Sequence, residues 1–237
     1  MNVTFSRRRV EAIWRRARAA RDLPLDGPEG WSQSNVDPMA LLHVFSALRL
    51  KPGFILRAYR VRCGGNGNGI VYAMPEQAPF PEPEQCRKDV DHSREPPIPP
   101  QALARVMDAV EGDGTPWSFF SASLFAREVS EFGAMWHGES WHAHHIVASD
   151  PVSFIKRENA RFSSKFEADA WTWEEPLPAR WEPAVHEANS SISVVFHTYT
   201  ALGQQRIVQH MDQYEPTTYE FRTTCRVLAY GPTGYIP

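Results

Sequence analysis

The chain has 237 residues, of which 42% are hydrophobic and 22% are charged, and its formal net charge is −3. This ordinary globular composition predicts a single domain over residues 1–237. No window approaches the roughly 20 apolar residues that span a bilayer, and the first residues lack the apolar segment of a secretory signal. The three cysteines, Cys63, Cys86 and Cys225, form no C-x-x-C pair, so they provide neither a thiolate zinc site nor a disulfide framework. We therefore expect a cytoplasmic protein without a membrane span.

Positive charge is concentrated at the start of the chain. Up to residue 21 there are seven arginines and one acid, so this stretch carries +6 and the remainder −9. Four apolar residues recur in it at helical spacing, namely Val10, Ile13, Trp14 and Ala17. This periodicity predicts an amphipathic helix over about residues 6–21, with a narrow apolar stripe and an arginine face. Such a helix suits docking on an acidic surface of its own chain, a second copy or another protein.

The middle of the chain predicts further helices and one hairpin. Asp37-Pro38 is typical of a helix start, and the apolar spacing that follows predicts a helix continuing to Pro52-Gly53. Two β-prone runs flank the glycine-rich residues 64–69 and predict a hairpin. Residues 75–100 hold eight prolines, which predicts a long surface loop or linker. Helical spacing then predicts helices over 100–112 and 116–132, and Asp150-Pro151 predicts the start of another.

The last part of the chain is predicted to form strands. Three runs, 191–200, 205–214 and 217–230, are rich in β-branched and aromatic residues, and the last alternates clearly between apolar and polar positions. Because the helices precede most of the strands, the predicted class is α+β. Its core is a mainly antiparallel sheet, with a C-terminal meander, packed with several helices from the N-terminal and middle parts.

Histidines form the most informative pattern in the sequence. Four of the nine lie in MWHGESWHAHHIV, residues 135–147. If this stretch is a strand, His142 and His144 share a face about 6.5–7 Å apart, close enough to share a metal. Further along the chain, a two-residue turn with Gly203 at its first position would place His197 directly opposite His210.

That register would bring Tyr199 and Asp212 to the same face as the two histidines, with Arg222 supplied by the next strand. His210-Met211-Asp212 has the H-x-D spacing of two ligands of non-haem iron oxygenases, although no histidine follows to complete that set. A purely structural role for each histidine stays open as the alternative.

Together these residues predict an enzyme that performs metal-assisted hydrolysis on a small polar substrate in a histidine-lined pocket, with Zn²⁺ or Fe²⁺ as the metal. The candidate metal ligands are His142, His144, His197, His210 and Asp212. The candidate catalytic residues are Glu139, as general base, with Tyr199 and Arg222. The alternative is a non-catalytic module that binds another protein, or a second copy of the chain, through the Arg-rich helix. Nucleic-acid binding through the same helix is a third, disfavoured reading, because the chain is not basic overall.

Overall fold

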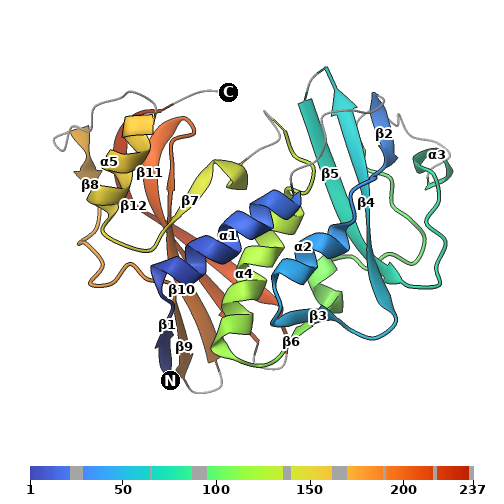
Figure 1. Ribbon diagram of the computed structural model, residues 1–237, viewed down its shortest axis with the longest axis horizontal. Coiled ribbons are helices and arrows are strands. Elements are labelled where there is room, and N and C mark those ends of the chain that lie inside the picture. The colour runs from blue at the N-terminus through green and yellow to red at the C-terminus, as the bar shows by residue number, and fades with distance from the viewer. Residues whose placement is uncertain are drawn as a thin grey trace. The chain divides into compact units, whose positions relative to one another are not determined.

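The computed structural model describes residues 1–21, 29–64, 66–86, 95–135, 140–161, 170–188, 191–215 and 218–234. The chain forms two compact units (Figure 1). Unit 1 comprises Met1–Trp14, His142–Thr217 and Phe221–Pro237, and unit 2 comprises Arg15–Trp141 with Thr218–Glu220. The single domain expected over residues 1–237 stays a prediction.

Unit 1 is built on a curled antiparallel sheet, in the order β1-β9-β10-β11-β12-β8, with β7 also paired to β10 (Figure 1). Its strands are β1 (Asn2–Thr4), β7 (His144–Val147), β8 (Thr172–Trp173), β9 (Ala184–Ala188), β10 (Ser191–Thr200), β11 (Gln204–Tyr214) and β12 (Phe221–Thr233). Consecutive strands from β9 to β12 pair antiparallel. The predicted α+β class with a mainly antiparallel sheet is confirmed.

Helix α5 (Pro151–Arg161) covers part of one face of this sheet. It begins at the predicted Asp150-Pro151, where the Asp150 carboxylate accepts the backbone N–H of Ser153 at 2.9 Å. Its buried Phe154 and Ile155 belong to the same core cluster as Tyr199 of β10. The remaining members of the cluster are Val147, Trp171, Ile207, Leu228 and Ala229.

Unit 2 contains a three-stranded antiparallel sheet, β2-β4-β5, and the small β3-β6 pair. Its strands are β2 (Gly30–Gln33), β3 (Leu48–Leu50), β4 (Phe54–Cys63), β5 (Asn66–Pro75) and β6 (Val110–Gly112), and its helices are α2 (Pro38–Val44), α3 (Pro83–Cys86) and α4 (Pro116–Ser130). The predicted hairpin is β4-β5, and the helix expected over 116–132 is α4. Within the described part of the proline-rich region, the one helix is the four-residue α3.

Two of the predicted helices are wrong in extent, and one pairing between strands explains both differences. The helix expected to continue to Pro52-Gly53 ends at Val44, and the helix expected over 100–112 is replaced by a short 3-10 turn, η1 (Val106–Ala109), followed by β6. The reason is that Leu48–Leu50 pairs antiparallel with Val110–Gly112. Contacts between residues far apart in sequence thus override the local helical spacing.

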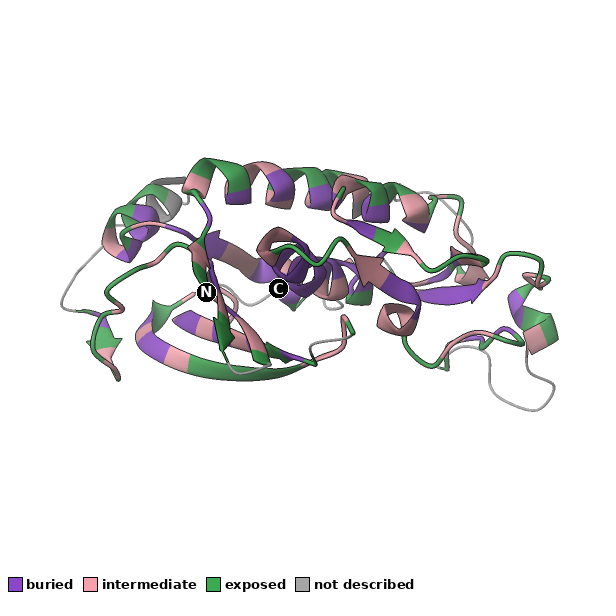
Figure 2. Cartoon of the chain, turned by 90° about the horizontal axis from the view of Figure 1, so that it is seen from below, coloured by how far each residue is buried: buried purple, intermediate pink, exposed green. Residues whose placement is uncertain are grey.

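Helix α1 (Arg7–Arg21) occupies the range predicted for the Arg-rich helix. Its apolar stripe is buried, with Val10 fully covered and Ile13 6% exposed, whereas Arg8 and Arg16 are exposed. Figure 2 shows buried and exposed residues interleaved along several of the helices and strands. No helix in the ranges that the structure describes is long and apolar enough to cross a membrane.

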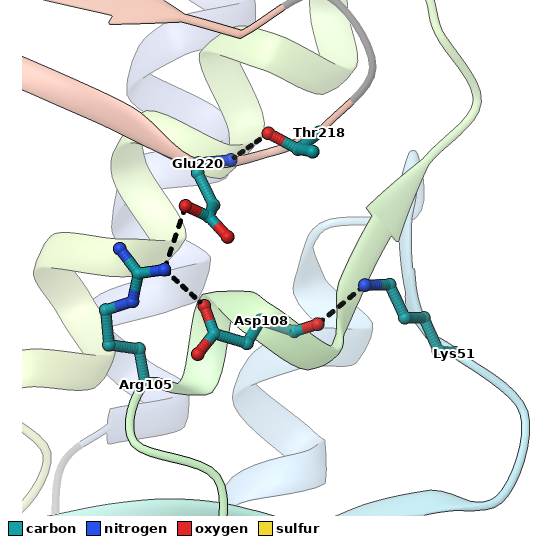
Figure 3. A network of polar contacts seen from close by, with 5 residues as sticks. All are labelled: Lys51, Arg105, Asp108, Thr218 and Glu220. Carbon is teal, nitrogen blue, oxygen red and sulfur yellow. Dashed lines mark hydrogen bonds and ion pairs between the residues drawn. The ribbon is translucent and has the colours of Figure 1, made fainter.

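Residues 218–220 are held within unit 2 by a network of polar contacts (Figure 3). The guanidinium of Arg105 lies 2.8 Å from the carboxylates of both Asp108 and Glu220, and Lys51 donates to the backbone carbonyl of Asp108 at 2.7 Å. Tyr219 stacks on Phe119 with their ring centroids 4.9 Å apart. This short segment is therefore anchored by both charge and aromatic packing.

Candidate functional site

The register of β10 on β11 decides which of the predicted site residues meet. His197 lies opposite Gln209, and His210 lies opposite Phe196. The predicted pairing of His197 with His210 is therefore wrong by one residue. The loop is longer than the expected two-residue turn: Thr200 pairs with Arg206, and Gly203 lies between them with φ of 67°.

This shift separates the predicted residues onto two faces, because successive side chains of a strand point to opposite sides. One face, called the His210 face, carries Phe196, Thr198, His210, Asp212, Thr223 and Cys225. The other, called the His197 face, carries His197, Tyr199, Gln209 and Arg222.

The histidine-rich segment contributes one residue to the His210 face. Strand β7 begins at His144, and His142 lies in the preceding 3-10 turn, η3 (Trp141–Ala143). His142 and His144 therefore do not lie on one strand, which was the condition for them to share a face. His144 pairs with Thr200 of β10, which places it on the His210 face. Glu139 lies outside the described residues.

Four side chains on the His210 face form a continuous hydrogen-bonded chain, which we call the relay: His144, Thr198, His210 and Cys225. The hydroxyl of Thr198 lies 2.8 Å from Nδ1 of His144 and 2.8 Å from Nε2 of His210. The opposite nitrogen of His210, Nδ1, lies 3.3 Å from Sγ of Cys225. Strands β7, β10, β11 and β12 thus each supply one member.

The relay combines an accessible sulfur with a shielded imidazole. Cys225 is exposed, whereas His210 is 5% exposed and Thr198 is fully buried. The ring of Phe196 stacks on that of His210, with centroids 4.8 Å apart and planes 13° from parallel. These contacts fix the plane of the imidazole and leave its Nδ1 edge toward the thiol.

A second polar pair lies next to the relay on the same face. The Thr223 hydroxyl donates to Oδ1 of the fully buried Asp212 at 2.7 Å. Asp212 is two residues from His210 along β11, a separation of about 6.5–7 Å between side chains on one face.

The His197 face has a different character. The pKa of His197 is lowered to about 4, chiefly by burial. A hydrogen bond with the backbone of Trp181 partly opposes this effect, and the positive charge of Arg226 adds a smaller lowering. Gln209 Nε2 donates to Nε2 of His197 at 3.1 Å, so this imidazole is held neutral. His197 is therefore a buried hydrogen-bonding residue of this face rather than a neighbour of His210.

The two remaining predicted catalytic residues also lie away from the relay. Tyr199 is 3% exposed, donates its hydroxyl to Gln205 at 3.0 Å and packs in the core cluster beneath α5. Arg222 is exposed on β12, opposite Gln213. Neither side chain is on the face that carries His210.

Among the residues that the structure describes, no three His, Cys, Asp or Glu side chains are placed so that they could hold a metal ion. His144 and His210 do converge, with ring centroids 5.8 Å apart. However, their facing nitrogens both contact the hydroxyl of Thr198, which lies between them. The two rings are thus hydrogen-bonded to one and the same hydroxyl.

A thiol, an imidazole within hydrogen-bond reach, and a third group that orients the imidazole form the general arrangement of an activated nucleophile. Cys225, His210 and Thr198 have this arrangement. The alternation predicted along residues 217–230 could not identify the histidine that lies opposite Cys225. That information depends on the β11–β12 register, in which Cys225 pairs directly with His210.

Comparison with known proteins adds no assignment to this geometry. The chain matches no family model, no curated protein and no solved structure.

Proposed function

We propose that the protein is a hydrolase-type enzyme that acts on a small polar carbonyl substrate, with Cys225 as nucleophile and His210 as its base. The observation that carries this proposal is the 3.3 Å contact between Cys225 Sγ and His210 Nδ1, with the other nitrogen of His210 held by Thr198. A thiol is a weak nucleophile until its proton is removed, and an adjacent imidazole is the usual acceptor of that proton.

The reaction has two balanced halves. His210 takes the thiol proton, the sulfur attacks the carbonyl carbon, and the leaving group departs with the proton from His210, leaving a thioester on Cys225. Water then attacks the thioester while His210 accepts a proton from it, and that proton returns to the sulfur as the acid leaves.

The first test is the rate at which iodoacetamide alkylates each cysteine at neutral pH, measured by peptide mass spectrometry. Cys63 is the internal control, because it is also exposed. We expect Cys225 to react about tenfold faster than Cys63, and His210→Gln to reduce the rate of Cys225 to that of Cys63. Equal rates in the wild type would overturn the proposal.

The second test is catalysis. Hydrolysis of a panel of small activated esters should be measurable for the wild type and lost in Cys225→Ser, which keeps the shape of the side chain. Cys63→Ser is the matched control and should keep the wild-type rate. Activity that survives in Cys225→Ser would assign the reaction to another group.

A metal-assisted form of the same hydrolysis, with Zn²⁺ or Fe²⁺, is a separate proposal. It is supported by the convergence of His144 and His210. It predicts near-stoichiometric metal in freshly purified, untagged protein and loss of that metal in a His144→Ala, His210→Ala double variant. Metal-free protein that retains the fast alkylation of Cys225 would favour the thiol mechanism.

The thiol mechanism also suits a cytoplasmic location, which we propose for the chain. Cys63, Cys86 and Cys225 are thiols rather than disulfides, and the reducing cytoplasm keeps thiols in that state. Localisation of the tagged full chain in cell fractions is the corresponding measurement.

The alternative function is a docking module that binds an acidic protein surface, including that of a second copy, through the arginine face of α1. It is supported by the exposure of Arg8 and Arg16 opposite the buried stripe. Because removal of α1 would expose that stripe, substitution is a cleaner test than truncation. The double substitution Arg8→Gln with Arg16→Gln should weaken self-association of the chain, measured by analytical ultracentrifugation.

The matched control is Arg57→Gln with Arg180→Gln, since both residues are exposed and the charge change is the same. Loss of association in both double variants, or in neither, would reject docking through α1. Oligonucleotide binding would support a nucleic-acid function instead if it falls steeply with salt and is lost in the Arg8→Gln, Arg16→Gln variant but not in the control.

A further inference from the structure

The other two members of the relay, Thr198 and His144, constrain the directions of the hydrogen bonds at His210. A hydroxyl carries one proton, so it donates one hydrogen bond and accepts the others. The hydroxyl of Thr198 lies 2.8 Å from a nitrogen of His144 and 2.8 Å from a nitrogen of His210. Thr198 is fully buried, and among the described residues these two nitrogens are the partners of its hydroxyl, so the hydroxyl proton is donated to one of them. If both rings are neutral, the other nitrogen then donates its N–H to the hydroxyl oxygen.

This constraint couples the tautomers of the two histidines. When Thr198 donates to Nδ1 of His144, it accepts from Nε2–H of His210, and Nδ1 of His210 presents a lone pair to Cys225. When Thr198 donates to His210 instead, Nδ1 of His210 carries the proton and faces the sulfur with an N–H. Only the first arrangement leaves His210 able to remove the thiol proton.

Transfer of the proton from Cys225 to His210 requires the same directions of these hydrogen bonds. Once His210 has accepted the proton from Cys225, both of its nitrogens are donors, so Nε2–H must donate to the hydroxyl of Thr198. The hydroxyl proton can then be donated onward to Nδ1 of His144, and hydrogen bonds that run in one direction polarise and strengthen one another. The imidazolium is thus stabilised through a chain that ends at the lone pair of His144.

We propose that His144 is a positioning residue for the reaction at Cys225, which acts through Thr198 to set the His210 tautomer that faces the sulfur. The inference rests on the proposed function, because it assigns His144 a role in activating the same thiol. It gives the histidine-rich segment a role without a metal: β7 supplies the acceptor at the end of the relay.

The decisive variants differ in whether they keep an acceptor where Nδ1 of His144 lies. His144→Asn keeps one, because the amide oxygen is attached at the same position as Nδ1, whereas His144→Phe keeps the ring shape and removes the acceptor. We expect His144→Phe to slow alkylation of Cys225 about tenfold, the effect of losing a hydrogen bond to a charged group, and His144→Asn to stay within about twofold of the wild type. Thr198→Val should match His144→Phe.

Two outcomes separate this inference from the function on which it rests. If Cys225 reacts no faster than Cys63 in the wild type, the proposed nucleophile fails. If Cys225 is fast and slows in His210→Gln, yet His144→Phe and Thr198→Val leave it unchanged, the function survives and the positioning role of His144 is overturned.

A measurement on the unmodified protein makes the test independent of variant folding. Long-range ¹H–¹⁵N NMR spectra distinguish the two neutral histidine tautomers, and in the folded wild type we expect both His144 and His210 to carry the proton on Nε2. A proton on Nδ1 of His210 would overturn the inference.

Discussion

At the scale of single residues, the histidines on the two faces of the unit 1 sheet lie in different environments. His210 contacts a thiol and a hydroxyl, and its environment provides partners for either protonation state. His197 is 3% exposed and has a pKa lowered to about 4, chiefly by burial. The same residue type is thus a candidate base on one face and a neutral structural group on the other.

The lowered pKa of His197 predicts a dependence of stability on pH. Its value in the unfolded chain is near 6.5, so between about pH 6.5 and pH 4 the unfolded state binds more protons than the folded state. Stability should therefore fall as the pH decreases through this window, and the full effect is about 3 kcal/mol. Urea unfolding at several pH values should show a smaller fall for His197→Gln, which cannot be protonated; identical pH profiles would contradict the assignment.

At the scale of elements, strand β5 depends on a close approach to the end of α4. A Cβ atom at Gly69 would overlap the backbone carbonyl of Phe132, a fully buried residue just beyond the helix. A Cβ atom at Gly67 would meet mainly the flexible side chain of Met135, 3.2 Å from its sulfur. Two glycines on one strand thus differ in what a side chain would displace.

This difference predicts unequal effects of the same substitution. Gly69→Ala should lower the free energy of unfolding by about 2–3 kcal/mol, because backbone must move to relieve the overlap. Gly67→Ala is the matched control and should cost less than about 1 kcal/mol, because the methionine can change rotamer. Denaturant titrations of both variants would measure the difference, and equal losses would argue against the close approach at Gly69.

At the scale of the whole molecule, neither unit is a continuous stretch of chain. Unit 1 uses three segments, and the three residues Thr218–Glu220 of unit 2 lie in sequence between its strands β11 and β12. Tyr219 contacts Ser118 through its hydroxyl at 2.6 Å and accepts the backbone N–H of Gly114 at 3.0 Å. The chain therefore passes from unit 1 into unit 2 and back again between β11 and β12.

We accordingly predict one cooperative unfolding transition, followed by far-ultraviolet and near-ultraviolet circular dichroism. Tyr219→Ala removes the stacking on Phe119 as well as both hydrogen bonds, so it should lower the midpoint at both wavelengths together. Tyr219→Phe, which removes only the hydroxyl, should lower it less. Two separate transitions in the wild type would show that the units unfold independently, and the single-domain prediction would then be wrong.

The sequence by itself determined the features that depend on local periodicity and turn chemistry. These include the Arg-rich helix, the helix starts at Asp37 and Asp150, the β4-β5 hairpin and the α+β class. Each follows from residues close together in the chain, whose spacing and capping chemistry are visible without the fold.

Only the tertiary structure decided which side chains meet. A shift of one residue between β10 and β11 separates His197 from His210, and pairing of β11 with β12 brings Cys225 to His210 instead. Strand register is set by loop length and by burial of whole faces, and each one-residue shift moves every side chain of a strand to the other side of the sheet. The histidines were visible in the sequence, but their partners were fixed by contacts between residues distant along the chain.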